Sequence, residues 1–329
     1  MRYFITGATG FIGGHVARQL LAAGHSVVVL ARTPAKAQTL AEAGAEIAAG
    51  DITDRESLIE PMRGADGVFH IAAWYEVGAK DPSRAEVINV EGTRNVLEVM
   101  RELAIPKGVY TSTIAVNSDT HGELVDESYR YEGPHLSEYD RTKWCAHYEV
   151  ALPMMAEGLP LVVVQPGVVY GPGDHSAIRL TLVDYLRGRL PMAPKGTAFC
   201  WAHVEDIARG HIQAMERGHL GECYALAGPN YRLTEVLAMA ESITGIKAPR
   251  FAAPGGLLRV FSAIMGVVER VLPVPVPMRS ETLRVSAGTT YIASAAKAER
   301  ELGFAPRALE EGLRETLEHE MALLGISPG

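Results

Sequence analysis

The first 23 residues constrain the fold more than any other part of the chain. A short apolar run, Arg2 to Thr6, leads directly into the glycine-rich sequence TGATGFIG, and an amphipathic helical pattern follows from Phe11 to Ala23. Gly7, Gly10 and Gly13 lack Cβ atoms, which permits a tight turn, close approach of backbone N–H groups to an anion, and close packing of the helix on the strand. The order strand, glycine loop and helix predicts that the helix N-terminus binds the pyrophosphate of a dinucleotide.

The first half of the chain continues this alternation of short strands and helices. Runs rich in β-branched and aromatic residues indicate strands, and amphipathic patterns between them indicate helices. The predicted strands are 2–6, 27–30, 45–49, 67–71, 108–112 and 161–165, and the main helical patterns are 11–23, 33–43 and 84–103. Such alternation is typical of an α/β fold with a doubly wound parallel sheet, that is, a Rossmann domain covered by helices on both faces.

The pattern changes after Gly171. A helical segment near 176–189 and a Pro/Gly-rich connection precede another helix at 204–217 and a strand at 222–226, and from Asn230 onward the chain is mainly helical. We expect residues 1–171, rejoined by 202–228, to form the dinucleotide-binding Rossmann domain. Residues 172–201 and 229–329 are expected to form a smaller, mainly helical lobe that binds the substrate.

Composition and charge disfavour several other classes of protein. The net charge is −8 with acidic and basic residues interspersed, which argues against a nucleic-acid partner. No run is long enough to span a membrane, because charged residues interrupt the most apolar stretch, 255–272. The sequence shows no signal peptide and its three cysteines form no C-x-x-C pair, so we expect a cytoplasmic protein with free thiols.

Two further chemistries lack the residues that they need. His135, His175 and His203 show no metal-ligand spacing with another His, Cys or carboxylate, so we expect no metal site. No strand carries a G-x-S-x-G sequence, which disfavours a hydrolase.

The end of the second predicted strand indicates which dinucleotide is bound. NAD-preferring proteins of this fold place a carboxylate there to hold the ribose hydroxyls, but this sequence reads VVVLARTPAK. Arg32, with Lys36 nearby, could instead neutralise a 2′-phosphate. We therefore expect a preference for NADP(H) over NAD(H), with NAD(H) as the alternative if both cations are simply solvated.

A tyrosine and a lysine one helical turn apart suggest the catalytic groups. Tyr139 and Lys143 in YDRTK would project from one face of a helix that begins near Ser137. Earlier in the chain, YTSTIAV places Ser112 and Thr113 at the carboxyl edge of the sheet, where ligands bind in open α/β folds.

These side chains have complementary chemistry. An unperturbed tyrosine titrates near ~10, and a nearby ammonium together with an oxidised nicotinamide lowers that pKa. We expect Tyr139 to protonate a carbonyl oxygen as hydride reaches the carbon, Thr113 to hold that oxygen, and Lys143 to orient the cofactor ribose. Ser112 stays open as the alternative to Thr113.

Six motifs together resemble the extended short-chain dehydrogenase/reductase family. They are TGATGFIG, GDIT at 50–53, HIAA at 70–73, NVEGT at 89–93, YDRTK, and QPGVVYGPG at 165–173. Within this family the likeness is to the dihydroflavonol 4-reductase-like and NAD-dependent epimerase/dehydratase group, which also shows the late pattern KAERELGFAPR at 297–307. One departure is Thr113, where many members have serine.

The resemblance implies further contacts. Asp51 and Ile52 would contact adenine, Ala72 would line the cofactor cleft, and the 165–168 segment would pass close to the nicotinamide. The full set of expected cofactor-binding residues is Gly7, Thr9, Gly10, Phe11, Ile12, Gly13, Arg32, Lys36, Asp51, Ile52, Ala72, Ala73, Tyr139, Lys143, Pro166, Gly167 and Val168. The expected substrate contacts are Trp74, Tyr75, Thr113 and Tyr170, although Trp74 and Tyr75 also fit an ordinary packed pair.

The function expected from these residues is NADP(H)-dependent reduction of a ketone or aldehyde. A nucleotide-sugar epimerase or dehydratase with retained cofactor is the main alternative, and a non-catalytic NADP-binding sensor is the remote one. The apolar stretch 255–272 favours a core helix, but it could also form a lid over an apolar carbonyl substrate or dock on a membrane surface. The resemblance adds the expectation of a homodimer paired through helices 84–103 and 137–157.

Overall fold

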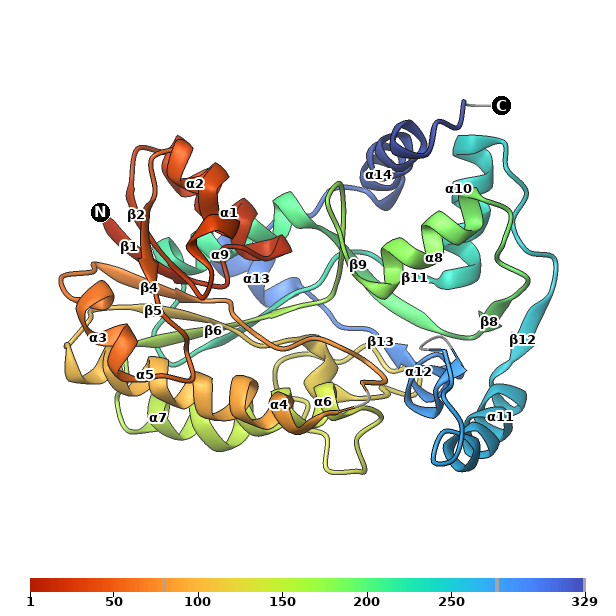
Figure 1. Cartoon of the computed structure of the whole chain (residues 1–329), viewed down its shortest axis with the longest axis horizontal. Helices are drawn as coiled ribbons and strands as arrows, with labels where there is room; N and C mark the ends of the chain where they lie inside the picture. Colours follow the sequence, from red (N-terminus) through yellow and green to blue (C-terminus); the bar gives the residue numbers. More distant parts are fainter. Residues whose placement is uncertain (80, 276–277, 328–329) are drawn as a thin grey trace.

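The computed structural model describes residues 1–79, 81–275 and 278–327. Its main sheet has seven strands in the order β10-β6-β5-β4-β1-β2-β3, and every neighbouring pair is parallel (Figure 1). The strands are β1 (Arg2–Thr6), β2 (Ser26–Ala31), β3 (Glu46–Ala49), β4 (Gly67–His70), β5 (Gly108–Thr111), β6 (Leu161–Pro166) and β10 (Cys223–Leu226). The predicted parallel Rossmann sheet is confirmed, with its change of direction between β1 and β4, where ligands bind in this class of fold.

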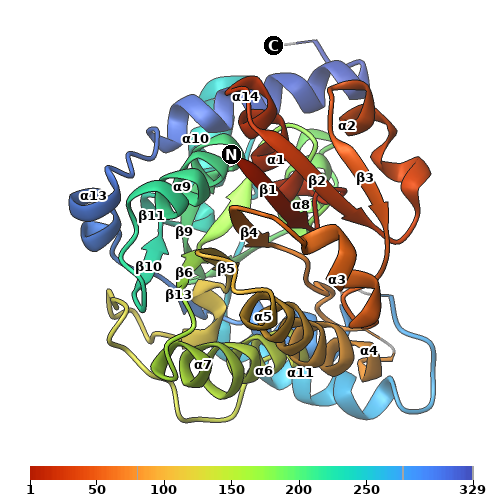
Figure 2. The same ribbon diagram turned by 90° about the vertical axis from the view of Figure 1, so that its left-hand side faces the viewer.

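Helices cover both faces of the sheet (Figures 1 and 2). One layer contains α1 (Phe11–Ala22), α2 (Gln38–Glu42), α9 (Val204–Arg217) and α13 (Ala296–Leu302), and the other contains α3 (Glu56–Met62), α5 (Gly92–Glu102) and α7 (Leu152–Ala156). Alternate residues of one strand enter the two cores: Tyr3 and Ile5 face the first layer, and Phe4 faces the second. Burial on both faces explains why these strands are almost continuously apolar.

Two of the predicted helices contain a wider π-helical turn. The segment predicted at 84–103 is built from α4 (Ser83–Glu86), the π-turn η2 (Val87–Glu91) and α5. The segment that begins near Ser137 is α6 (Glu138–Cys145), followed by the π-turn η4 (Ala146–Ala151) and α7. Such turns often occur at functional sites, and η2 carries Asn89, which reaches the catalytic helix.

Beyond Gly171 the structure contains strands that the sequence patterns missed. β9 (Ala198–His203) pairs with β7 (Val168–Tyr170), β11 (Asn230–Arg232) and β13 (Thr290–Tyr291), and β8 (Ala193–Lys195) pairs with β12 (Ala252–Pro254). A third core lies between this sheet and helices α8 (Ala177–Leu186), α10 (Leu233–Thr244) and α14 (Leu309–Leu324). β9 reads AFCWAH without a β-branched residue, so its extended form depends on the three strands that pair with it.

The expectation that residues 255–272 form a core helix is wrong. α11 (Gly255–Val268) is indeed a helix and packs beside α12 (Ser280–Val285), but Ser262 is its one buried residue. Val260, Ile264 and Val267 are exposed by 61%, 54% and 64%. No helix in the described ranges is both long and apolar enough to cross a membrane.

Candidate active site

The glycine loop adopts the conformation that the sequence predicts. Gly7 has φ +79°, and a Cβ on it would lie 2.5 Å from the backbone nitrogen of Ala72. A Cβ on Gly13 would lie 2.4 Å from the carbonyl oxygen of Gly7, so neither position tolerates a side chain. Gly10 is the N-cap of α1, no side chain caps that helix, and its first turn contains no acidic residue. The free N–H groups and partial positive charge at this helix start fit a pyrophosphate.

A buried row of polar groups holds the loop against the sheet. The Thr6 hydroxyl lies 2.8 Å from Nδ1 of His70 and accepts hydrogen bonds from the backbone N–H groups of Ile71 and Ala72. On its other side the His70 ring reaches the Thr93 hydroxyl at 3.0 Å. Burial, helped by the charge of Lys143, lowers the pKa of His70 to about 3, so its ring is neutral at physiological pH. These bonds fix Ala72 beside Gly7.

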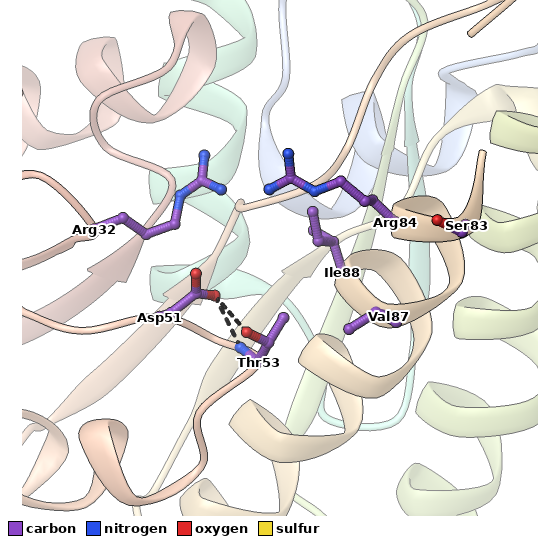
Figure 3. Close-up of a pocket in the computed structure, with 7 residues that line it drawn as sticks. All are labelled: Arg32, Asp51, Thr53, Ser83, Arg84, Val87 and Ile88. Carbon is purple, nitrogen blue, oxygen red and sulfur yellow. Dashed lines mark hydrogen bonds between the residues drawn. The ribbon is translucent and has the colours of Figure 1, made fainter. Parts of the chain in front are cut away.

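A pocket of about 270 Å³ opens where the adenosine end of a dinucleotide is expected. Arg32 from the end of β2 and Arg84 from α4 point toward each other across it, with Asp51 below them (Figure 3). Neither arginine forms an ion pair with a carboxylate in the described ranges of the chain. Lys36, on the turn η1 (Pro34–Ala37), is exposed and does not line this pocket.

The other expected adenine contacts have defined local partners. One carboxylate oxygen of Asp51 accepts hydrogen bonds from the backbone N–H and the hydroxyl of Thr53, both at 3.0 Å. Ile52 is buried and its side chain packs under Gly92, so any contact of Ile52 with adenine would involve little of its side chain. Thr9 and Ala73 are exposed near the loop, whereas Phe11 and Ile12 are half-buried at the start of α1.

The catalytic residues expected from the sequence meet at the carboxyl end of the sheet. Ser137 caps α6 through a 3.0 Å bond to the Asp140 backbone, which sets Tyr139 in the first turn. Burial raises the pKa of Tyr139 above its ordinary value and Tyr75 adds to the rise, while a hydrogen bond with the Thr113 hydroxyl acts in the opposite direction. Without a bound cofactor the pKa of Tyr139 is therefore raised, whereas the sequence led us to expect a lowered pKa.

Lys143 is oriented by the strand below it. Its Nζ donates hydrogen bonds to the hydroxyl of Tyr110 at 3.1 Å and to the carbonyl of Thr111 at 2.8 Å, and it lies 4.7 Å from the centre of the Tyr110 ring. Burial lowers the pKa of Lys143 to about 7. Its charge is thus easily lost in the protein alone, and a bound anionic or hydroxyl-bearing ligand would favour the charged form.

The two candidate hydroxyls have different environments. Ser112 is 3% exposed, and its hydroxyl lies 2.9 Å from Nδ1 of the buried His147. Thr113 contacts Tyr139 and also accepts a 3.1 Å bond from the N–H of Ala115, which begins the short turn η3 (Ile114–Asn117). The structure brings Thr113 to the tyrosine and directs Ser112 toward α6 and η4.

Of the expected substrate contacts, Tyr75 lies at the catalytic tyrosine. Its ring is perpendicular to that of Tyr139 at a centroid distance of 4.8 Å, and the residue is 53% exposed. Trp74 is held by its backbone, because the Asn89 side chain accepts from its N–H at 2.7 Å and donates to its carbonyl at 3.1 Å. The same amide donates to Thr142 on the catalytic helix. Tyr75 is thus fixed against α6.

Tyr170 is not a substrate contact. It is 1% exposed and its ring packs edge-on against Trp201 and His203 in the third core. The residues before it do reach the sheet edge: Pro166 ends β6, and Gly167 passes so close to β9 that a Cβ on it would lie 2.5 Å from the carbonyl oxygen of Cys200. Val168 then begins β7 and is half-buried.

Comparison with known proteins defines the family. A sequence model of the NAD dependent epimerase/dehydratase family matches residues 3–227. The chain belongs to this family. It is 32% identical to a Synechocystis protein whose name assigns it to the dihydroflavonol 4-reductases. This match covers 96% of this chain and 93% of that protein. It is 33% identical, over 94% of each chain, to the 4-hydroxy-2-methyl-3-oxo-4-farnesyl-3,4-dihydroquinoline-1-oxide ketoreductase of Stigmatella aurantiaca.

A solved structure shows the same fold. The crystal structure of gox2253 superposes with a TM-score of 0.86 at 30% identity and covers 99% of both chains. The predicted membership of the extended short-chain dehydrogenase/reductase group is confirmed, and with it the assignment as an NAD(P)-dependent enzyme.

Several residues of this epimerase/dehydratase-family protein act at the site although sequence reasoning gave them no role. Asn89 and His147 are buried polar residues that orient Trp74 and Ser112, and Arg84 faces the adenosine pocket. Asp140 is buried beside Tyr139 and accepts hydrogen bonds from Ser137 and Tyr291. Asn89 lies in the NVEGT motif and Asp140 in the YDRTK motif, so these motifs were the signal that the sequence offered. The hydrogen-bond partners of both residues include residues from distant segments of the chain.

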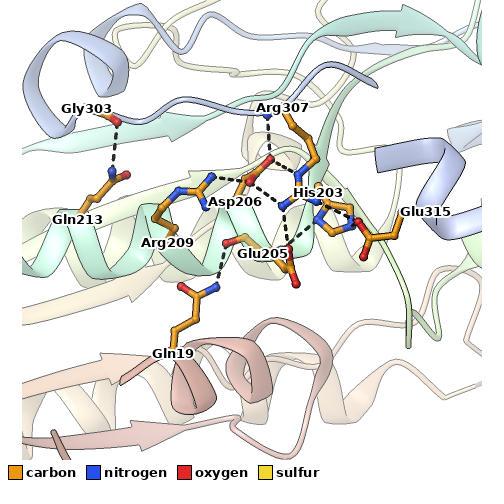
Figure 4. Close-up of polar contacts among 9 residues, drawn as sticks. All are labelled: Gln19, His203, Glu205, Asp206, Arg209, Gln213, Gly303, Arg307 and Glu315. Carbon is orange, nitrogen blue, oxygen red and sulfur yellow. Dashed lines mark hydrogen bonds and ion pairs between the residues drawn. The ribbon is translucent and has the colours of Figure 1, made fainter. Parts of the chain in front are cut away.

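A cluster of polar residues outside the catalytic centre includes His203, for which the sequence pattern indicated no partner as a metal ligand. His203, Glu205 and Glu315 have side-chain atoms close enough to hold a metal ion, and Nε2 of His203 lies 3.7 Å from Glu315 (Figure 4). Arg307 already pairs with both carboxylates, at 2.8 Å and 3.0 Å, and with the buried Asp206. A guanidinium among these acids neutralises them and repels a cation, so the cluster joins α9 to α14.

Proposed function

We propose that the protein is an NADP(H)-dependent carbonyl reductase that converts a rather apolar ketone or aldehyde to an alcohol. The observation that carries this proposal is the meeting of Tyr139, Thr113 and Lys143 at the sheet edge, beside the uncapped start of α1. A proton donor, a second hydroxyl and a cation next to a dinucleotide site are the groups that carbonyl reduction requires.

The adenosine pocket supports NADP(H) over NAD(H). A 2′-phosphate carries up to two negative charges, and the two guanidinium groups of Arg32 and Arg84 converge on the pocket without carboxylate partners in the described part of the chain. Asp51 is the one carboxylate in the pocket lining, and its bonds to Thr53 turn one oxygen away from the arginines. Arg84 therefore joins Arg32 in this proposal, ahead of Lys36.

The residues of this chain would divide the proton chemistry among them. When bound, NADPH supplies the hydride. Tyr139 donates the proton to the substrate oxygen. Burial raises its pKa, so the phenol is protonated before the cofactor binds, and a nearby positive charge would have to lower that pKa for efficient donation. The Thr113 hydroxyl donates a second hydrogen bond to that oxygen. Lys143 lies one helical turn from Tyr139 on α6, and its ammonium, when charged, would favour the phenolate left behind.

An apolar substrate is supported by the entrance and by a relative. The exposed ring of Tyr75 stands over Tyr139, and Trp74 is fixed beside it. The Stigmatella ketoreductase is named for a ketone that carries a farnesyl chain. We retain the division into a dinucleotide-binding part, 1–171 with 202–228, and a substrate-binding lobe, 172–201 with 229–329, as part of this proposal.

The deciding experiment measures NADPH oxidation with a panel of ketones, aldehydes and nucleotide sugars. A reductase consumes NADPH in proportion to the alcohol formed, and Tyr139→Phe should lower kcat by about 10²-fold or more. Turnover of a nucleotide sugar without net cofactor consumption would instead establish an epimerase or dehydratase. Unchanged turnover in Tyr139→Phe would refute the mechanism.

Cofactor choice has its own test. We expect kcat/KM to be higher with NADPH than with NADH, and Arg32→Ala and Arg84→Gln each to reduce the NADPH value while leaving the NADH value nearly unchanged. Arg94→Ala is the matched control, because Arg94 lies on α5, the same helical segment, but pairs with Glu91 at 3.6 Å. Equal values with the two cofactors, unaffected by Arg32→Ala, would contradict the preference.

A further inference from the structure

The exposed face of α11 is a continuous apolar stripe. Leu257, Val260, Phe261, Ile264 and Val267 recur at helical spacing on one side of the helix and are exposed by 39% to 64%. Val271 and Leu272 extend the stripe past the helix end, at 82% and 59% exposed. The opposite side holds Ser262, which donates a 2.8 Å bond to the carbonyl of Ser280 on α12. Because the opposite side of α11 is bonded to α12, the apolar stripe faces outward in a defined orientation.

The segment of the chain that contains this stripe has a different charge from the rest of the protein. Residues 245–290 contain six cations and two acids and so have a net charge of +4. The whole chain has a net charge of −8, so the remaining residues have a net charge of −12. The six cations are Lys247, Arg250, Arg259, Arg270, Arg279 and Arg284, and none of them pairs with a carboxylate among the described residues. Both acids are hydrogen-bonded within the protein: the exposed Glu269 accepts from Ser280, and the partly buried Glu281 accepts from the N–H of Glu138.

The helix pair is joined to the entrance of the active site. Arg279 donates to the carbonyl of Gly78, in the loop that follows Tyr75, and Arg284 donates to the carbonyl of Leu136 at 2.8 Å, just before the catalytic helix α6. α12 thus contacts both sides of the entrance while α11 lies outside it, at the end of the molecule remote from the N-terminus (Figure 1).

We propose that the α11 stripe docks on an anionic membrane surface, so that an apolar carbonyl substrate dissolved in the bilayer passes along α12 to Tyr139. Apolar side chains would enter the boundary between headgroups and acyl chains. The exposed Arg270 would reach lipid phosphates, and so would the exposed Arg259 once its 3.4 Å bond to the Ala287 carbonyl is released. Docking itself stands on the stripe and its charge, whereas the delivery of substrate rests on the proposed reductase function.

A second copy of this chain fits the stripe less well. A 14-residue helix is about 21 Å long, and a stripe about 10 Å wide offers roughly 200 Å², compared with about 800 Å² per partner in a standard interface. A twofold interface would also place the positively charged segment against its own copy, which costs like-charge repulsion. An anionic surface instead complements that charge.

The test is co-sedimentation of the full chain with vesicles, compared between pure phosphatidylcholine and phosphatidylcholine with about one-third phosphatidylglycerol. We expect binding to the anionic vesicles that weakens as salt rises. Val260→Asp with Ile264→Asp should abolish it, and Arg259→Gln with Arg270→Gln should reduce the partition coefficient by about 25-fold, at about fivefold per cation. Leu323→Asp is the control, because Leu323 is 63% exposed on α14, away from the stripe.

Each outcome of this experiment either supports or overturns the docking proposal. A wild-type protein that stays in the supernatant, or binding that the Val260/Ile264 pair of substitutions leaves unchanged, would overturn the proposal. So would light scattering that shows a dimer dissociated by Ile264→Asp, since the stripe would then be a contact between copies. Turnover of a water-soluble ketone should be the same in Ile264→Asp and wild type. Vesicle binding without any NADPH oxidation would refute the reductase function and leave the docking surface standing.

Discussion

Replacing Ser112 and Thr113 one at a time should separate a structural hydroxyl from a catalytic one. Ser112 Oγ lies 2.9 Å from Nδ1 of His147, and both residues are about 3% exposed. Ser112→Ala leaves a buried ring nitrogen without its partner, which costs about 1–3 kcal/mol. For a chain of 329 residues the unfolding entropy is about 0.7 kcal/mol/K, so a loss of about 2 kcal/mol lowers Tm by about 3 °C. We expect its kcat to stay within about twofold of wild type.

Thr113→Ala should produce the opposite pattern. Its hydroxyl contacts Tyr139, and removing a preorganised donor to the reacting oxygen costs about 10²–10³ in kcat, or about 2.7–4 kcal/mol of transition-state stabilisation. The loss of its cap on Ala115 adds only about 1 kcal/mol of destabilisation. Thr113→Ser keeps both bonds and should retain most of the activity.

The assay pairs steady-state NADPH oxidation with thermal unfolding followed by circular dichroism, for wild type and the three variants. The reasoning fails if Ser112→Ala loses about 10²-fold in kcat at an unchanged Tm while Thr113→Ala remains active. That result would make Ser112 the catalytic hydroxyl and would mean that the His147 contact is broken when substrate binds.

Three further predictions concern the loop, the α9–α14 junction and acid stability. Gly13→Ala places a methyl group 2.4 Å from a loop carbonyl and should weaken NADPH binding at least tenfold in a fluorescence titration; wild-type affinity would contradict the loop assignment. Arg307→Met removes one of the two arginines that pair with Asp206, which is 1% exposed, and leaves Arg209 at 2.5 Å, so it should cost about 2–3 kcal/mol in urea unfolding. Arg314→Ala, from an exposed pair, should cost under about 1 kcal/mol, and equal losses would refute this. Burial lowers the pKa of His211 to about 4 in the folded state, so the neutral ring contributes fully to the free energy of unfolding above about pH 6.5. Protonation in the unfolded state should reduce that free energy by about 2 kcal/mol between pH 7 and 5. In His211→Asn the free energy of unfolding should fall less steeply over this range, and an unchanged slope would exclude this histidine.

The parallel sheet was predictable because its signal is local. Most of the seven strands are short apolar runs that are buried on both faces, and the exception is the edge strand β3, which begins with the exposed Glu46. The α11 stripe shows where such reasoning fails. A 3.6-residue apolar period indicates that a face is buried, yet the same pattern appears in a helix whose apolar side is exposed. Only the position of α12 shows which side of α11 is covered.

The sequence by itself determined the dinucleotide loop and the spacing of Tyr139 and Lys143, because a turn and a helical repeat involve neighbours in the chain. The tertiary structure decided what those residues meet. It placed Arg84 opposite Arg32 across the adenosine pocket, turned Ser112 to His147, and buried Tyr170 in the lobe. These contacts join residues from 31 to 52 positions apart, and such pairings are set by how strands and helices pack and not by the local pattern of either partner.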